Sequence, residues 1–191
     1  PGRSWVQVLL RGSIFPSTWV YYNTFFLLSQ AIFIEVIVMQ VIEYRRALHR
    51  IPELDRDLPE TLAYLRSVLE PLGCALFSPI PGALCAFFDF GKADAIAFRS
   101  DADALPIQEQ TGLPFASTHP GKMHARGHDG HMSMVLDLAV WLDGQNDLKH
   151  NVLLIFQPAE ETTGGAKDLC QSGVFEQYNV TCLFGLHLWP A

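Results

Sequence analysis

The stretch NVLLIFQPAEE, residues 151–161, indicates the fold class. Its first part, Asn151 to Phe156, is a continuous apolar run of strand length, which is typical of a strand buried on both faces. The carboxylates Glu160 and Glu161 follow almost at once. A strand of this kind needs helices on each side, and in such sheets the chemistry lies just past the carboxyl ends of the strands. The stretch therefore predicts an α/β protein whose functional groups follow its strands.

Helical and strand patterns alternate on both sides of this stretch. Gly91-Lys92 separates two short apolar runs, which predicts a hairpin or a pair of neighbouring strands. A mixed sheet flanked by helices on both faces is expected. The predicted elements are helices over residues 34–48, 59–69 and 132–142, strands over residues 83–90, 93–98 and 151–156, and a turn and strand over residues 173–184.

The composition suits an ordinary folded protein. The chain has 191 residues, is 49% hydrophobic and carries 20 acidic against 13 basic residues, a net charge of −7. This length and apolar content are enough for a buried core and exclude disorder. The acidic excess argues against a nucleic-acid partner, because phosphate binding needs clustered Lys and Arg. The four cysteines form no CxxC pair, which favours a reducing compartment and a cytoplasmic location.

The first residues differ from the rest. Residues 12–34 contain no charged side chain, and the charges before them are Arg3 and Arg11. The uncharged run is long enough to span a bilayer, but Pro16 and several polar residues dilute it. We interpret residues 1–32 as an apolar extension of separate character. A membrane anchor through residues 12–34 is the less favoured alternative.

The segment MHARGHDGHM, residues 123–132, carries three histidines and an aspartate. Imidazole and carboxylate together suit zinc, manganese, cobalt or nickel. Gly127 and Gly130 would let the backbone turn sharply, so that neighbouring side chains converge. The alternative is a polar loop whose histidines are close by chance. The density of histidines favours a metal site.

Paired carboxylates follow two of the predicted strands. At a strand end, Glu160 and Glu161 would point in different directions, so that one can bind a metal ion while the other takes a proton from water. On an exposed helix such a pair is usually only a solvated face. Asp101 and Asp103 lie two apart after a strand, where a carboxylate can orient a ligating histidine, although a turn or helix cap explains either one equally well. His187, taken alone, fits a structural residue of an apolar strand.

Taken in order, these segments resemble the aminoacylase/hippurate hydrolase family of dinuclear metallopeptidases, which includes the plant indole-acetyl-amino-acid hydrolases. The segments that carry the resemblance are LHRIPEL (48–54), FRSDADALPIQEQTGLPFAST (98–118), MHARGHDGHM (123–132), LIFQPAEE (154–161), GGAK (164–167) and GLHLWP (185–190). The resemblance implies a zinc-peptidase-like catalytic domain with two divalent ions, manganese or zinc, with cobalt and nickel as further candidates. It also implies a smaller lid and dimerisation domain, and hydrolysis of the amide bond of N-acyl amino acids, hippurate-like or acetyl-amino-acid.

The resemblance also assigns roles to single residues. Glu160 resembles the family's general base. Asp103 resembles a carboxylate that orients a metal ligand, the role expected above for Asp101 as well. The position that holds a metal-binding cysteine in the family is Arg126 here, and a guanidinium has no lone pair to give to a metal. The residues that match metal ligands of the family are His128, Glu161 and His187.

Members of the family are longer than this chain, which ends at Ala191, where the lid domain would begin. Residues 33–191 are therefore expected to form the N-terminal part of the catalytic domain, with an open sheet edge, poor solubility and none of the lid through which the family forms homo-oligomers. Two functions stay open. One is a metal-dependent amidohydrolase that cleaves small-molecule N-acyl amino acids by metal-activated water. The other is a catalytically inactive remnant in which acidic residues pair with Arg126.

Overall fold

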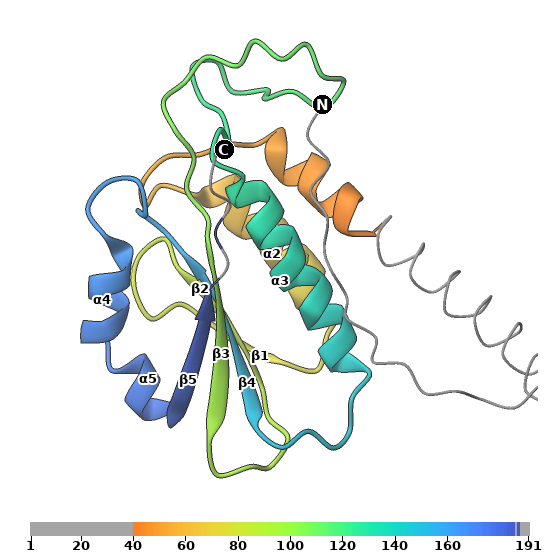
Figure 1. The fold of residues 1–191 in the computed structure, drawn as a ribbon, viewed down its shortest axis with the longest axis vertical. Coiled ribbons are helices and arrows are strands. Elements are labelled where there is room, and N and C mark those ends of the chain that lie inside the picture. The colour runs from red at the N-terminus through yellow and green to blue at the C-terminus, as the bar shows by residue number, and fades with distance from the viewer. Residues whose placement is uncertain (1–39, 186, 188–191) are drawn as a thin grey trace, which may run out of the picture. The chain divides into compact units, whose positions relative to one another are not determined.

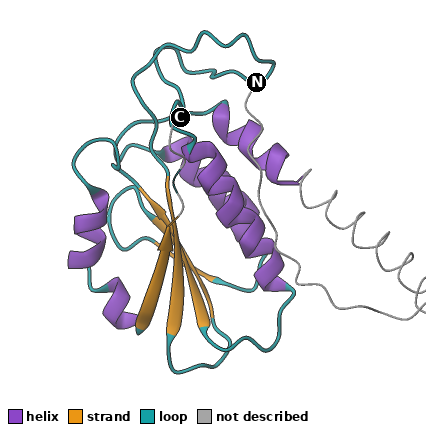
Figure 2. Ribbon diagram, viewed as in Figure 1, coloured by secondary structure: helices purple, strands orange, loops and turns teal. Residues whose placement is uncertain are grey.

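A five-stranded sheet lies between two layers of helices in the computed structural model, which describes residues 40–185 and residue 187 (Figures 1 and 2). The mixed α/β fold expected from the sequence is confirmed. In chain order the elements are a helix over residues 40–49, α2 (Pro59–Leu69), β1 (Ala75–Phe77), β2 (Leu84–Phe88), β3 (Ala95–Asp101), α3 (His128–Asp143), β4 (Asn151–Gln157), α4 (Gly165–Gln171), α5 (Val174–Gln177) and β5 (Val180–Gly185).

Strand β4 lies at the centre of the sheet. The strand order is β1-β2-β4-β3-β5, and all seven residues of β4 are buried. The pairs β1–β2 and β2–β4 are antiparallel, whereas β3 is parallel to both β4 and β5. An apolar strand of this kind is stable only where helices cover both of its faces and a strand pairs with each edge. The interpretation of residues 151–156 as a strand buried on both faces is therefore confirmed.

The expected hairpin between residues 83–90 and 93–98 is wrong. Both runs form strands, β2 and β3, but β4 lies between them, so they are not neighbours either. The chain between β2 and β3 must therefore cross the end of β4 at which β4 begins. The side chain of Asn151, the first residue of β4, holds it there. Its carbonyl oxygen accepts hydrogen bonds from the backbone N–H groups of Phe90 (2.8 Å) and Lys92 (3.2 Å), and its amide donates to the carbonyl of Lys92 (2.8 Å). Asn151 thereby holds the β2–β3 connection across the start of β4.

Alternate residues of the strands face two separate cores. On one face Leu154 and Phe156 pack against α2, α3 and the 40–49 helix, and on the other Leu153 and Ile155 pack against α4 and α5. Figure 1 shows α2 and α3 on one side of the sheet and α4 and α5 on the other. Each fully buried side chain of this size contributes about 1.5–3 kcal/mol to the stability. These two cores fix the direction of every strand end.

The predicted helices are confirmed within the described residues, with one difference at the site. Helix α2 has the predicted bounds, and the buried carboxylate of Glu53 accepts the N–H groups of Glu60 (3.2 Å) and Thr61 (2.8 Å) in its first turn. Helix α3 begins at His128, four residues earlier than the predicted start at residue 132. Two histidines of the loop therefore belong to a helix. Strand β1 and helices α4 and α5 were not predicted, and all three are short.

Because β3, β4 and β5 are parallel, their carboxyl ends meet at one edge of the sheet. Helix α3 begins at the same edge and runs back along the sheet (Figure 1). The polar segments that follow the three strands, and the histidines that open α3, are thus brought together by the topology. This is the arrangement expected for a site past the ends of parallel strands.

Buried ionic contacts tie the 40–49 helix to the first turn of α3. The Nδ1 atom of His49 lies 2.8 Å from Asp129 Oδ2, and its Nε2 atom lies 3.2 Å from Glu109 Oε1. The Nε atom of Arg45 lies 3.2 Å from the same oxygen of Asp129. Both ring nitrogens of His49 face carboxylates, so both donate protons, and the hydrogen bond to Asp129 raises the pKa of His49 above its usual value despite burial. This contact anchors the residue next to His128.

Strand β5 forms an edge of the sheet and is largely exposed. Leu183 and Phe184 are 46% and 49% exposed, and the strand VTCLFG contains no charged residue. Natural edge strands usually carry charges that block pairing with other chains. The open, apolar edge expected from the sequence is therefore present in the described residues.

None of the helices in the described part of the chain has the length and apolar character that crossing a bilayer needs. The uncharged stretch of residues 12–34 and the extension of residues 1–32 lie outside the described residues.

We predict that His49→Gln destabilises the fold in a pH-dependent way. A raised pKa means that the folded state binds the His49 proton more tightly than the unfolded state does. The stabilisation is therefore complete below pH 6.5 and is lost as the pH rises through the pKa of the folded state. At pH 6 the variant should be less stable by about 2 kcal/mol. Urea unfolding of both proteins between pH 5.5 and 9, with a chelator present to remove metal ions, checks this prediction. A difference in unfolding free energy that stays constant across this pH range would contradict it.

We also predict that the β5 edge makes the chain self-associate, because unpaired backbone groups and apolar side chains are exposed together. Leu183→Lys should lower the apparent mass in light scattering at a given concentration. Ile107→Lys is the matched control, since Ile107 is 42% exposed but lies outside any strand. Equal effects of both substitutions would show that general solubility, and not the strand edge, controls the association.

Candidate metal centre

The first turn of α3 presents two histidines to the edge of the sheet. Gly127 precedes the helix with a φ of 82°, a left-handed conformation that favours glycine, so the chain turns directly into His128. His128 and His131 are three residues apart and therefore share a helix face, and both are buried. Gly130 lies inside the helix, so the sharp turn expected there does not occur. The backbone turns at Gly127 alone of the two glycines.

The ring of His128 is fixed by the backbone. Its Nδ1 atom lies 2.7 Å from the carbonyl oxygen of Asp103, which can only accept, so Nδ1 carries the proton. The Nε2 atom is then a lone-pair donor. It is buried without a hydrogen-bond partner and lies 3.5 Å from Asp101, 3.8 Å from Glu160 and 3.7 Å from Glu161. This tautomer is the one that binds metal ions.

Asp101, the last residue of β3, is the centre of a histidine cluster. Its Oδ1 accepts the Nδ1 proton of His131 at 2.7 Å, and its Oδ2 lies 3.1 Å from Nη1 of Arg99 and 3.5 Å from Nε2 of His187. Burial alone would raise the pKa of Asp101, but the hydrogen bond from His131 and the electrostatic effects of the neighbouring His128 and Arg99 lower it to about 2. Asp101, His128, His131 and His187 offer ligand atoms within 4.8 Å of one another.

Asp103 positions the two glutamates. Its carboxylate oxygens accept the backbone N–H groups of Glu160 and Glu161, each at 3.0 Å. Burial raises the pKa of Asp103, and these two N–H groups partly oppose that effect. Asp101 and Asp103 thus both reach the site, as expected, but their contacts differ: the carboxylate of Asp101 contacts histidines, whereas Asp103 contacts His128 through its carbonyl and the glutamates through its carboxylate.

The turn that carries the glutamates is held tightly. Ala159 has a φ of 55°, a left-handed conformation that costs energy for any residue with a Cβ atom. Its N–H donates to the carbonyl of Asp55 (3.0 Å), and its own carbonyl accepts from Gly164 (2.9 Å) and Gly165 (3.2 Å). A Cβ atom on Gly165 would meet the carbonyl oxygen of Pro158 at 2.1 Å, so only glycine fits there. The glutamates therefore leave the sheet in a fixed direction.

Three buried polar atoms at this point have no hydrogen-bond partner: His128 Nε2, Glu160 Oε2 and Glu161 Oε1. His128, Glu160 and Glu161 also form a group whose ligand atoms all lie within 4.8 Å of one another. Unsatisfied buried polar atoms are costly, and here three potential ligand atoms converge from a helix and a loop. A divalent cation would satisfy all three, so these residues fit a metal ion.

Arg126 contacts the same group. Its Nη1 atom lies 3.3 Å from Glu161 Oε2, and its side chain is 55% exposed. Burial and the neighbouring Glu160 raise the pKa of Glu161, whereas Arg126 lowers it. The oxygen that Arg126 contacts is not the oxygen without a partner. Arg126 therefore pairs with one carboxylate oxygen of Glu161, and the other oxygen lies near His128.

Two further histidines of the loop were not assigned from the sequence. His131 joins the Asp101 cluster, and its spacing of three residues from His128 is the signal that could have found it, once the helix is placed correctly. His124 is buried, neither ring nitrogen has a hydrogen-bond partner, and burial lowers its pKa to about 4. No sequence pattern marks His124, or the His49–Asp129 contact, as buried.

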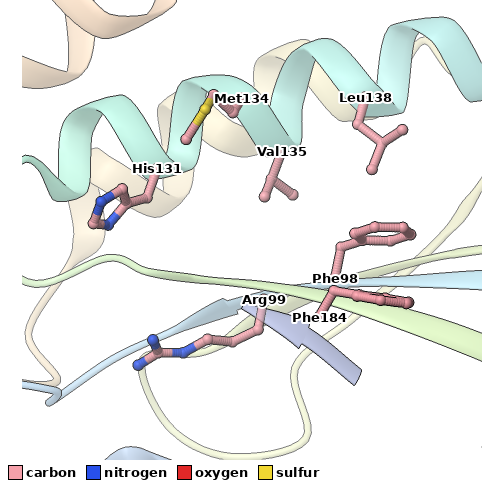
Figure 3. A pocket seen from close by; sticks show the side chains of 7 residues that line it. All are labelled: Phe98, Arg99, His131, Met134, Val135, Leu138 and Phe184. Atoms are coloured by element: carbon pink, nitrogen blue, oxygen red, sulfur yellow. The ribbon is translucent and has the colours of Figure 1, made fainter. Parts of the chain in front are cut away.

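An apolar cavity of about 290 Å³ adjoins the histidine cluster (Figure 3). Figure 3 shows His131 and Arg99 at one end of the cavity and the rings of Phe98 and Phe184 at the other. These two rings stack with their centroids 5.3 Å apart. The cavity is lined by Phe98, Arg99, His131, Met134, Val135, Leu138 and Phe184.

The sequence matches known proteins over the same region. The profile of peptidase family M20/M25/M40 matches residues 97–191. An uncharacterised hydrolase of Staphylococcus epidermidis is 41% identical over 150 residues, which is 77% of this chain and 39% of the relative. The chain thus spans about two fifths of the length of such relatives.

Solved structures agree with the sequence match. The YXEP protein of Bacillus subtilis, described as a dinuclear metal-binding peptidase of the M20 family, is 38% identical with a TM-score of 0.76, covering 82% of this chain and 44% of that protein. A putative aminohydrolase from methicillin-resistant Staphylococcus aureus is 37% identical with a TM-score of 0.73, covering 78% and 39%. Residues 97–191 thus match the profile of peptidase family M20/M25/M40, and the fold is similar to that of a solved member of the M20 family.

Proposed function

We propose that this chain carries the metal-binding part of a hydrolase that cleaves the amide bond of N-acyl amino acids. The observation that carries the proposal is the convergence of His128 Nε2, Glu160 Oε2 and Glu161 Oε1, three buried polar atoms without hydrogen-bond partners, at the carboxyl edge of the sheet. The hydrolase names of the relatives and the dinuclear metal site of the Bacillus subtilis neighbour support it.

His128, Glu161 and His187 are the proposed metal ligands, as the resemblance to aminoacylases implies. His128 is oriented by the carbonyl of Asp103, and His187 lies beside the Asp101 carboxylate. Manganese and zinc are the proposed ions, since imidazole and carboxylate ligands suit both. When bound, such an ion lowers the pKa of a water molecule and polarises a substrate carbonyl.

Glu160 is the proposed general base. Its carboxylate lies beside the ligand group, with Oε2 3.8 Å from His128 Nε2, and its backbone N–H is held by Asp103. A carboxylate in this position can accept a proton at Oε2 and return it to the amine that leaves when the amide bond breaks. The fixed left-handed turn at Ala159 keeps the carboxylate in place during that exchange.

The proposed substrate is a small-molecule N-acyl amino acid with an apolar acyl group. The apolar cavity next to His131 is a suitable volume for such a group, and the resemblance to hippurate hydrolases suggests an aromatic one. A cytoplasmic location, the lack of a nucleic-acid partner and homo-oligomers formed through a lid domain stay predictions from composition and resemblance.

A second candidate is a chain that folds and binds ligands but does not catalyse. The observation that favours it is the ion pair between Arg126 and Glu161, because the guanidinium contacts one carboxylate oxygen of a proposed metal ligand. Resemblance places a metal-binding cysteine at this position, so the exchange removes a negative ligand and adds a positive charge.

We predict that Glu160→Gln lowers the rate of benzoyl-glycine hydrolysis in manganese by about 10²- to 10⁴-fold, because a neutral amide cannot accept the proton. Metal content, measured by elemental analysis after dialysis, should stay the same. Glu176→Gln, on an exposed position of α5, is the matched control and should keep the rate. Hydrolysis that survives Glu160→Gln would remove Glu160 from the mechanism. A folded, metal-loaded wild type without hydrolysis would favour the second candidate.

A further inference from the structure

We propose that this chain holds a single divalent ion, bound by His128 and Glu161 beside the proposed base Glu160, and that the guanidinium of Arg126 supplies part of the positive charge that a second ion would bring. The inference rests on the proposed function only in taking this site to be a metal site. It separates this chain from the Bacillus subtilis neighbour, which is described as dinuclear.

The charges at the site balance one dication. Four carboxylates face it, and two of them form ion pairs with arginines: Asp101 with Arg99 (3.1 Å) and Glu161 with Arg126 (3.3 Å). The nearby carboxylate of Asp129 is already paired with Arg45 and His49. The four carboxylates and the two guanidinium groups leave a net charge of −2. One divalent ion neutralises that charge, whereas a second would leave an excess of +2 in a largely buried site, which is costly. The four carboxylates belong to Asp101, Asp103, Glu160 and Glu161.

The same contacts locate the ion. Both oxygens of Asp101 are engaged, one by the Nδ1 proton of His131 and the other by Arg99. Both oxygens of Asp103 accept backbone N–H groups. In contrast, Glu160 Oε2 and Glu161 Oε1 are buried without hydrogen-bond partners. The ligand atoms that lack partners are therefore on the glutamate side of His128.

Arg126 adjusts this ion without blocking it. Its contact is with Oε2 of Glu161, and the oxygen without a partner is Oε1. The guanidinium cannot bind a metal, since it has no lone pair, but its charge weakens the attraction of the glutamate for a cation. Because the Arg126 side chain is 55% exposed, it can be replaced without opening a cavity in a core.

A cysteine at this position would change the balance by two charges. A thiolate in place of the guanidinium would leave the four carboxylates, the thiolate and Arg99, a net charge of −4, which two dications neutralise. A neutral side chain at position 126 would leave −3, so it should strengthen the binding of one ion without adding a negative ligand for a second. The three side chains thus predict different stoichiometries and affinities.

The test is a titration of the metal-free full chain with manganese, with ion counts by elemental analysis. Wild type should bind one ion, Arg126→Gln one ion roughly tenfold more tightly, and Arg126→Cys two. Electron paramagnetic resonance should show isolated manganese in wild type and a spin-coupled pair only in Arg126→Cys. Arg46→Gln is the matched control, because the Arg46 side chain is 49% exposed and pairs with the exposed Glu43 on its own helix, and it should behave as wild type.

Glu161→Gln tests the position of the ion: this variant should bind no manganese under conditions in which the wild type binds one ion. If Glu161→Gln keeps the ion, or if wild type binds two, the inference is overturned while the metal site itself stands. If wild type binds none and Arg126→Cys does, Arg126 excludes the ion, which also overturns it. If no variant binds manganese although circular dichroism and thermal unfolding show each to be folded, the proposed function fails with it.

Discussion

The burial of β4 on both faces is the constraint on which the rest of the structure depends. Seven consecutive buried residues require a helix layer on each side and a paired strand at each edge. The chain meets this requirement by carrying the β2–β3 connection across the start of β4, where the Asn151 side chain satisfies the backbone. As a result β3, β4 and β5 run parallel, and their polar carboxyl ends share one edge with the start of α3. The site is a consequence of how one apolar strand is covered.

At that edge the main chain places the polar side chains. Asp103 joins the end of β3 to the glutamate turn after β4 through two backbone N–H groups, and it joins both to α3 through the ring of His128. Three segments far apart in sequence are thereby held by one residue. The polar atoms that converge there have no hydrogen-bond partners among the described residues, and a cation stabilises such an arrangement.

Much of this could be predicted from the sequence, and the failures have physical reasons. The apolar run of residues 151–156 and the helical spacing of Leu62, Leu65 and Leu69 are strong local signals, and both predicted the correct elements, β4 and α2. The hairpin prediction failed because short linkers are compatible with either order of strands, and a side-chain contact from Asn151 decides between them. The start of α3 was placed too late because histidine and glycine are weak helix formers, although Gly127 sets its first turn. The role of His187 depends on its contact with Asp101. This contact joins the end of β3 to the segment after β5, and no local sequence pattern contains it.

Arg126 lies on the loop before α3. Its side chain is about half exposed, and its guanidinium contacts one carboxylate oxygen of Glu161. No core side chain depends on it, so this position can vary while the fold stays the same. Some arginine codons differ from cysteine codons by a single base. A single mutation at position 126 can therefore change the net charge of the site while the fold is kept.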